Sequence, residues 1–172
     1  EEISRLLSTK WVVPQVKFIN QFYDNDKFLD AWVDKASKFD VNSYDKVIFS
    51  YHGVPISHVD NVYPNSLCKD KNYENKITND NKFCYKATTY ETTKLLASRL
   101  NIPEENYIVT YQSRLFGKWL TPFTDDVLKL SPKKILKNYS TIKRLSGQKN
   151  VVIGFGITNK TIASFKKTDG LV

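Results

Sequence analysis

Methionine is absent from this sequence of 172 residues, even at position 1, so we expect a processed chain or, in preference, a fragment of a longer protein. Long apolar runs are also absent. Runs such as Val151–Ile157 fall far short of the roughly 20 residues that a membrane-spanning helix needs. The acidic start at Glu1 lacks the hydrophobic segment of a secretory signal peptide. We therefore expect a single globular α/β domain over residues 1–172.

Cysteine is scarce, since Cys68 and Cys84 are the only two, and this excludes a disulfide scaffold in a chain of this length. A reducing cytosol is the expected compartment. The net charge of +8 comes from scattered basic residues, so no nucleic-acid partner is expected. The densest basic region, Lys133–Arg144, predicts a solvated helix face, while association with an acidic membrane surface or a carboxylate-bearing ligand stays open.

Hydrophobic periodicity predicts an alternation of strands and helices. The predicted strands are Val12–Ile19, Lys46–Tyr51, Tyr107–Gln112, Lys149–Phe155 and a final one near 169–172. The predicted helices are Asp26–Phe39, Phe83–Leu100, one from Thr124, one from Ser131 and one from Thr158. Alternation of this kind favours an α/β fold of three αβα layers, with a mostly parallel sheet between helices. From His52 to about Asn81 the sequence predicts a long loop, most mobile over 59–81.

His52 is the first candidate for chemistry, because it directly follows a buried strand. Ligands of parallel sheets bind beyond the carboxyl ends of the strands. Imidazole is mostly neutral at neutral pH, so His52 can accept a proton or bind a divalent metal. A histidine that only caps the strand end by hydrogen bonding is an equally open interpretation. His58, in the polar loop, is expected to be solvated.

Two longer motifs resemble one enzyme family. The segment Phe49-Ser50-Tyr51-His52-Gly53-Val54-Pro55 resembles the histidine segment of ferrochelatases. Tyr111–Leu115, followed by Trp119-Leu120-Thr121-Pro122-Phe123-Thr124-Asp125, resembles the family's Gln-Ser-Arg-Leu-Gly and Trp-Leu-x-Pro-Tyr-Thr-Asp block. Lys10–Pro14 and Phe18–Asp24 are similar to the strand and loop before the histidine, so the resemblance covers about residues 6–130.

The resemblance implies a flavodoxin-like (chelatase-like) half of a ferrochelatase, which inserts ferrous iron into protoporphyrin IX during haem biosynthesis. It implies that His52 is the catalytic residue, binding metal or accepting pyrrole protons, with Fe²⁺ as a substrate and no tightly bound cofactor. Tyr51, Val54, Ser113, Trp119 and Phe123 would contact the porphyrin, and Arg114 would pair with a propionate. Core packing for Trp119 and Phe123, and a structural salt bridge for Arg114, remain open alternatives.

The chain also departs from the family pattern. Leu115–Trp119 is shortened, Phe123 replaces a tyrosine, and Cys68 and Cys84 match only the outer members of a four-cysteine loop. After Leu130 the family's acidic helix has no counterpart. The tail 131–172 instead resembles late strands of the tryptophan synthase α subunit and predicts a divergent or chimeric end. Three hypotheses follow: a ferrochelatase of doubtful competence, a non-catalytic porphyrin- or metal-binding α/β module, and a phosphate-binding fragment that uses the Gly154-Phe155-Gly156 turn.

Overall fold

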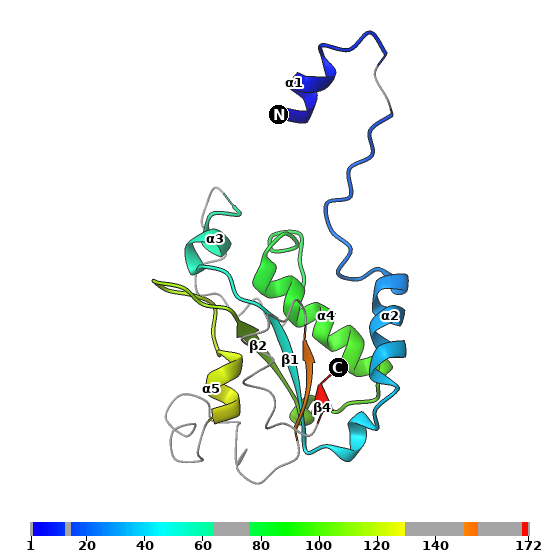
Figure 1. The fold of residues 1–172 in the computed structure, drawn as a ribbon, viewed down its shortest axis with the longest axis vertical. Helices are drawn as coiled ribbons and strands as arrows, with labels where there is room; N and C mark the ends of the chain where they lie inside the picture. Colours follow the sequence, from blue (N-terminus) through cyan, green and yellow to red (C-terminus); the bar gives the residue numbers. More distant parts are fainter. Residues whose placement is uncertain (1, 13–14, 64–75, 130–149, 155–169, 172) are drawn as a thin grey trace.

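The computed structural model describes residues 2–12, 15–63, 76–129, 150–154 and 170–171. In this part of the chain one sheet contains β1 (Lys46–His52), β2 (Tyr107–Gln112), β3 (Asn150–Gly154) and β4 (Gly170–Leu171), in the order β2-β1-β3-β4 (Figure 1). The pairs β1–β2, β1–β3 and β3–β4 are all parallel. The strands predicted at the positions of β1 to β4 are confirmed to within one residue at each end, and the parallel α/β sheet is confirmed with them.

Strand β1 lies at the centre, because it pairs with β2 on one side and β3 on the other. Its interior residues are buried, as expected of a short apolar run enclosed on both faces. The register with β2 runs from Val47 opposite Tyr107 to His52 opposite Gln112. The two strands therefore end at the same level, which brings the residues that follow them to one edge of the sheet.

Helix α2 (Asp26–Ala36) precedes β1, and α4 (Tyr85–Arg99) follows it. The amide side-chain oxygen of Asn25 accepts a hydrogen bond from the Phe28 backbone N–H at 3.2 Å and so caps α2. Helix α2 packs against α4, where the Arg99 guanidinium pairs with two carboxylates of α2, those of Asp26 and Asp30. The predicted helices over Asp26–Phe39 and Phe83–Leu100 are confirmed. The first ends three residues earlier than predicted, and the second starts two residues later and ends one residue earlier.

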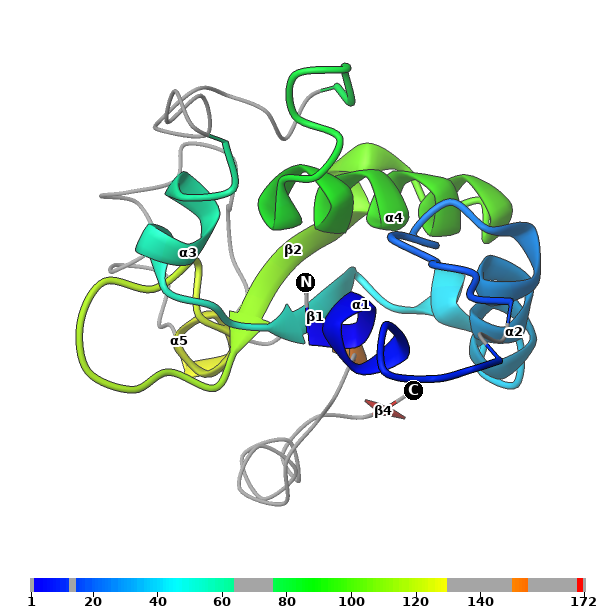
Figure 2. The same cartoon turned by 90° about the horizontal axis from the view of Figure 1, so that it is seen from above.

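Hydrogen bonds between side-chain hydroxyl groups connect α4 to one face of the sheet. The Tyr51 hydroxyl lies 2.8 Å from that of Thr93, and the Tyr111 hydroxyl lies 2.9 Å from that of Thr89. Both threonines belong to the buried face of α4, where their own hydroxyls also bond to helix carbonyls. Apolar neighbours such as Phe49 complete this core. Figure 2 shows α4 running along this side of β1 and β2.

The opposite face of the sheet receives α5 (Thr124–Lys129). Successive strand residues point to opposite faces, so Ser50 and Thr110 point away from α4. Their hydroxyls each lie 2.8 Å from the hydroxyl of Thr124, and all three side chains are buried. The sequence predicts a helix start at Thr124, which is confirmed, but its hydroxyl bonds to the sheet. Both faces of the sheet therefore contact a helix.

The predicted strand Val12–Ile19 is wrong for the residues that the structure describes. Residues 15–20 are extended but unpaired, and the segment after α1 (Glu2–Leu7) stands apart from the sheet (Figure 1). Phe18 and Ile19 are largely exposed. Val, Ile and Phe favour a strand only where a neighbouring strand takes up their backbone groups, and this segment has no such neighbour among the described residues.

The predicted loop from His52 to Asn81 contains a short helix, α3 (Ile56–Asp60), with Val59 buried. Much of the region predicted to be most mobile, 64–75, lies outside the described residues, as do Cys68 and the helices predicted from Ser131 and Thr158. Two strands of the tail, β3 and β4, belong to the same sheet as β1. Among the described helices, none has both the length and the apolar character needed to cross a membrane.

Candidate functional site

The candidate site begins where β1 and β2 end. His52 is the last residue of β1 and its side chain is exposed, as predicted for a histidine at the carboxyl end of a central strand. Strand alternation places it on the face of Ser50, which is the side of α5. Beyond Gln112, Ser113 has a φ of 61°, a left-handed conformation that turns the chain away from the strand direction. The two segments that carry the sequence motifs thus start side by side.

Backbone hydrogen bonds join these two segments directly. The Gly53 amide donates to the Gln112 carbonyl oxygen at 2.6 Å, and the Leu120 amide donates to the Val54 carbonyl oxygen at 3.1 Å. The Ile56 amide donates to the Lys118 carbonyl oxygen at 3.0 Å. Pro55 and Trp119 form an antiparallel bridge within this pairing. Two segments separated by more than 50 residues of sequence therefore form one rim, which we define as residues 52–56 and 112–120.

The two segments of the rim approach each other most closely at Gly53. A Cβ atom built at this position would lie 2.7 Å from the Gln112 carbonyl oxygen and 2.8 Å from that of Ser113. Both distances are far inside van der Waals contact, and both atoms belong to the backbone, which cannot swing aside as a side chain can. The glycine after His52 therefore serves a close approach of two backbones.

Arg114 makes contacts within the chain. Its guanidinium pairs with the carboxylates of Asp126 at 2.9 Å and Asp125 at 3.2 Å, and its Cζ atom lies 4.2 Å from the centre of the Phe123 ring. The hydrogen bond with Asp126 raises the pKa of Arg114 above its ordinary value. The salt bridge that the sequence left open is thus present, although all three charged side chains keep substantial solvent exposure. Whether Arg114 also binds a propionate stays a prediction.

The other predicted contact residues divide between two environments. Val54, Ser113, Trp119 and Phe123 are half-buried and belong to the rim or to the segment directly after it. The Trp119 indole N–H donates to the Phe116 carbonyl oxygen at 3.0 Å, while the Phe116 side chain is fully exposed. Tyr51 differs from these four, because it is buried and its side chain points toward α4, away from the face of His52.

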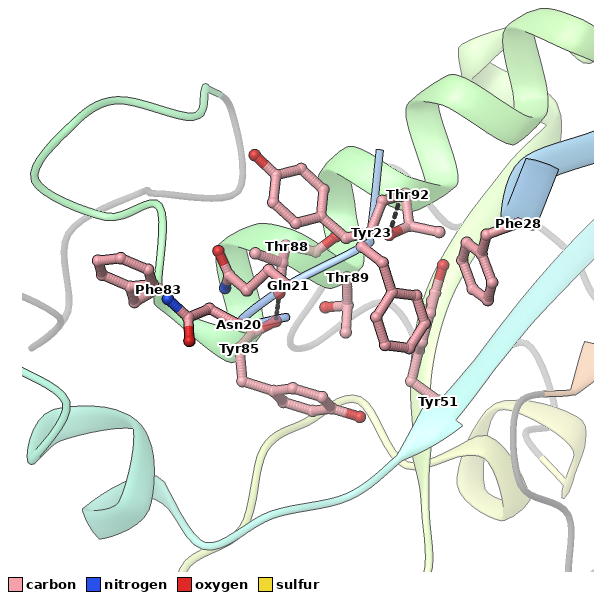
Figure 3. Close-up of a pocket in the computed structure, with 11 residues that line it drawn as sticks. Asn20, Gln21, Tyr23, Phe28, Tyr51, Phe83, Tyr85, Thr88, Thr89 and Thr92 are labelled. Carbon is pink, nitrogen blue, oxygen red and sulfur yellow. Dashed lines mark hydrogen bonds between the residues drawn. The ribbon is translucent and has the colours of Figure 1, made fainter. Parts of the chain in front are cut away.

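Tyr51 instead lines a cavity of about 380 Å³ between the end of β1, the start of α4 and the extended segment before α2 (Figure 3). Three tyrosines, three phenylalanines and three threonines supply most of its wall, with two amides at its edge: Tyr23, Tyr51, Tyr85, Phe22, Phe28, Phe83, Thr88, Thr89, Thr92, Asn20 and Gln21. Burial raises the pKa of Tyr51 well above its ordinary value. Its phenol therefore stays protonated in the folded chain.

Two groups at the rim could not be recognised from the sequence. The Tyr85 hydroxyl donates to the His52 carbonyl oxygen at 2.8 Å, and the Ser50, Thr110 and Thr124 hydroxyls cluster beneath the rim. Tyr85 belongs to a helical apolar stripe in the sequence, and such a stripe gives no sign of a contact 33 residues away. The only sign of the hydroxyl cluster in the sequence is that Ser50 and Thr110 are polar residues within otherwise apolar strands.

No group of three or more His, Cys, Asp or Glu side chains within the described ranges is placed to hold a metal ion. Cys84 is a free, buried thiol at the start of α4, and Cys68, the other cysteine, falls outside those ranges. His52 thus has no preformed set of further metal ligands in this part of the chain.

Comparison with known proteins supports the motif resemblance. The family profile described as ferrochelatase matches residues 1–143. The ferrochelatase of Legionella pneumophila (strain Corby) is 32% identical over 140 residues, which are 80% of this chain and 41% of that protein. Those of Coxiella burnetii (strain RSA 493) and Pseudomonas putida (strain W619) are 34% and 31% identical, with 72% and 71% of this chain covered. The match covers 36% and 39% of those two proteins, so the chain spans about two fifths of the length of its curated relatives.

Proposed function

Because the chain belongs to the ferrochelatase family, we propose that its rim binds protoporphyrin IX and that His52 takes part in the insertion of ferrous iron. Membership of this family implies a place in haem biosynthesis. That this chain itself inserts iron is a proposal, because the chain spans only about two fifths of the length of the related enzymes.

The backbone pairing of the two motif segments is the observation that supports this proposal most. Hydrogen bonds from Gly53 to Gln112 and from Leu120 to Val54 bring the exposed His52 beside the segment of Arg114 and Trp119. A porphyrin needs a neutral base or metal ligand at its centre, apolar surface beside its rings and a cation near its propionates. The rim has residues of each kind, among them His52, Trp119 and Arg114.

In the proposed reaction, the His52 imidazole accepts a pyrrole proton or holds the incoming Fe²⁺, which is a substrate. Val54 and Trp119 offer half-buried apolar surface to the macrocycle. Arg114 donates one hydrogen bond each to Asp125 and Asp126, so a ligand propionate competes with two carboxylates already paired with the guanidinium. Ser113, Phe123 and Tyr51 remain proposed contacts, the last through the cavity on the α4 side of the sheet.

We also propose that the described sheet and helices form one flavodoxin-like half of three αβα layers. The helices α4 and α5 on opposite faces support this, as do the four parallel strands. On this proposal residues 1–172 are one domain, with the tail 131–172 divergent although it supplies β3 and β4. A cytosolic location remains a proposal based on the scarcity of cysteine.

A non-catalytic porphyrin-binding module is the second candidate. The sequence after Leu130 lacks a counterpart of the family's acidic helix. Iron insertion needs a second group for proton removal as well as walls that bend the macrocycle. Under both candidates the chain binds porphyrin. They differ in whether insertion is measurable.

Fluorescence titration with protoporphyrin IX tests the binding that both candidates share. We expect saturable binding by the wild-type chain, weakened about tenfold or more in Trp119→Ala, because a buried aromatic contact is worth roughly 1.5–3 kcal/mol. Trp11→Ala is the matched control, since Trp11 is fully exposed in the N-terminal segment. Absence of saturable binding would overturn the proposal, and equal weakening by both variants would remove the rim from it.

A further inference from the structure

Two hydrogen bonds hold the peptide group between His52 and Gly53 from opposite sides. The Tyr85 hydroxyl donates to the carbonyl oxygen of His52 at 2.8 Å, and the Gly53 N–H donates to the carbonyl oxygen of Gln112 at 2.6 Å. The C=O and N–H of a trans peptide group point in opposite directions in one plane. Both bonds together therefore fix the orientation of that plane.

The orientation of this peptide plane matters for His52 itself. Rotation about its Cα–C bond changes the plane, and the rest of β1 holds the other side of the residue through its pairing with β2. With the plane fixed on both edges, the direction of the Cα–Cβ bond is fixed as well. We propose that Tyr85 is a positioning residue, whose hydroxyl sets the direction in which the His52 imidazole leaves the rim.

Tyr85 is itself firmly placed. It is the first residue of α4, and this helix is fastened to the sheet farther along by the bonds of Thr89 to Tyr111 and of Thr93 to Tyr51. Figure 3 shows the Tyr85 ring extending from the start of the helix toward the end of β1. Burial raises the pKa of Tyr85 to about 12, so the phenol keeps its proton and remains a donor at physiological pH.

The consequence for catalysis rests on the proposed function of His52. Groups that orient a metal-binding histidine by bonding to its ring N–H are typically worth about 10- to 100-fold in metal affinity or activity. Tyr85 acts on His52 through the backbone, so we expect Tyr85→Phe to lower kcat for iron insertion by about tenfold, the lower end of this range, with KM for protoporphyrin changed little. The ring, which contributes apolar surface, is retained in that variant.

The sequence allows the peptide group to be observed directly. The chain has two histidines, and only His52 is followed by glycine. Labelling histidine with ¹³C at the carbonyl and glycine with ¹⁵N therefore gives a single carbonyl–amide NMR signal, that of the His52–Gly53 peptide. In Tyr85→Phe we expect its carbonyl carbon to shift upfield, as on loss of a hydrogen bond, and the His52 imidazole signals to shift with it.

Tyr111→Phe is the matched control. It also removes one tyrosine hydroxyl bonded between α4 and the sheet, yet that hydroxyl bonds to Thr89 and not to His52. We expect it to lower stability while leaving the His52–Gly53 signal in place. Should Tyr85→Phe fail to fold, replacement of all tyrosine by 3-fluorotyrosine, a stronger donor, should move the same carbonyl signal downfield in the intact chain.

The NMR measurement needs no porphyrin and no iron, so it decides the positioning role separately from the proposed function. An unchanged carbonyl signal in Tyr85→Phe, or an equal shift in Tyr111→Phe, would overturn the proposal. A specific shift in a chain that inserts no iron would uphold the positioning of His52 and count against the proposed function alone. A specific shift together with a fall in kcat would support both.

Discussion

The amide of Gly53 lies 2.6 Å from the carbonyl oxygen of Gln112, so the residue after His52 is bonded to the last residue of the neighbouring strand. This bond continues the β1–β2 pairing one step past the strand end. It forces the segment 53–56 to leave the sheet beside 118–120, where two further backbone bonds follow. Backbone hydrogen bonds thus hold the rim together, and they fix the positions from which its side chains extend.

Substitution of Gly53 by alanine should disrupt this frame. The added Cβ meets two backbone oxygens at 2.7 and 2.8 Å, and neither can move without breaking the rim. We expect a loss of about 1–3 kcal/mol in the free energy of unfolding, as for other overpacked sites. Urea denaturation measures it. Ser57→Ala, at an exposed position of α3, should change stability by less than about 0.5 kcal/mol, and equal effects would contradict the account.

The hydroxyls of Ser50, Thr110 and Thr124 should act as one unit. Thr124→Val keeps the shape of the side chain but leaves two buried hydroxyls without this partner, at a cost of about 1–3 kcal/mol. Ser50→Ala should cost less, because Thr110 and Thr124 still bond to each other. A double-mutant cycle by chemical denaturation should give a coupling energy of at least about 0.5 kcal/mol between Ser50 and Thr124. Additive effects would show that the cluster is not cooperative.

Arg114 offers a test that separates a structural role from ligand binding. Its ion pairs are exposed, so Arg114→Ala should lower the free energy of unfolding by less than about 1 kcal/mol. If a propionate competes with Asp125 and Asp126, the double variant Asp125→Asn/Asp126→Asn should bind protoporphyrin more tightly than the wild-type chain. This gain should vanish when Arg114→Ala is added. A gain that persists without Arg114 would exclude it as the propionate partner.

Alkaline pH should destabilise the chain through its buried tyrosines. Burial raises the pKa of Tyr85 from 10.0 to about 12, and it also raises the pKa values of Tyr51 and Tyr111. The unfolded chain releases these phenol protons near pH 10, whereas the folded chain retains them. Their contribution to stability is therefore complete below about pH 10 and is lost as the pH rises toward 12. Denaturation across this range should show a smaller decline in Tyr85→Phe than in the wild-type chain.

Much of the sheet could be predicted from the pattern of apolar residues along the chain. Lys46–Tyr51 is a continuous apolar run and Tyr107–Gln112 alternates, and both form strands of the sheet. The segment Val12–Ile19 has the same composition but no partner strand in the described part of the chain. The composition of a segment shows which side chains a strand would bury. It does not show whether a second strand is available to pair with that segment.

The candidate site was predictable only where a residue follows a strand end. The position of His52 follows from that rule, and the family resemblance added Arg114 and Trp119. The hydrogen bond from Tyr85 and the close approach at Gly53 depend on how a helix and a loop distant in sequence fold back onto the rim. The burial of Tyr51 follows from strand alternation, which places it on the α4 face although it adjoins His52.

The central claim is that His52 takes part in iron insertion at a rim that binds porphyrin. The most direct measurement is anaerobic insertion of Fe²⁺ into protoporphyrin by the wild-type chain, His52→Ala and His58→Ala, with porphyrin binding measured on the same samples. We predict that all three bind porphyrin similarly, that the wild-type chain and His58→Ala insert iron slowly, and that His52→Ala falls to the uncatalysed rate. Equal insertion by His52→Ala and the wild-type chain would contradict the account.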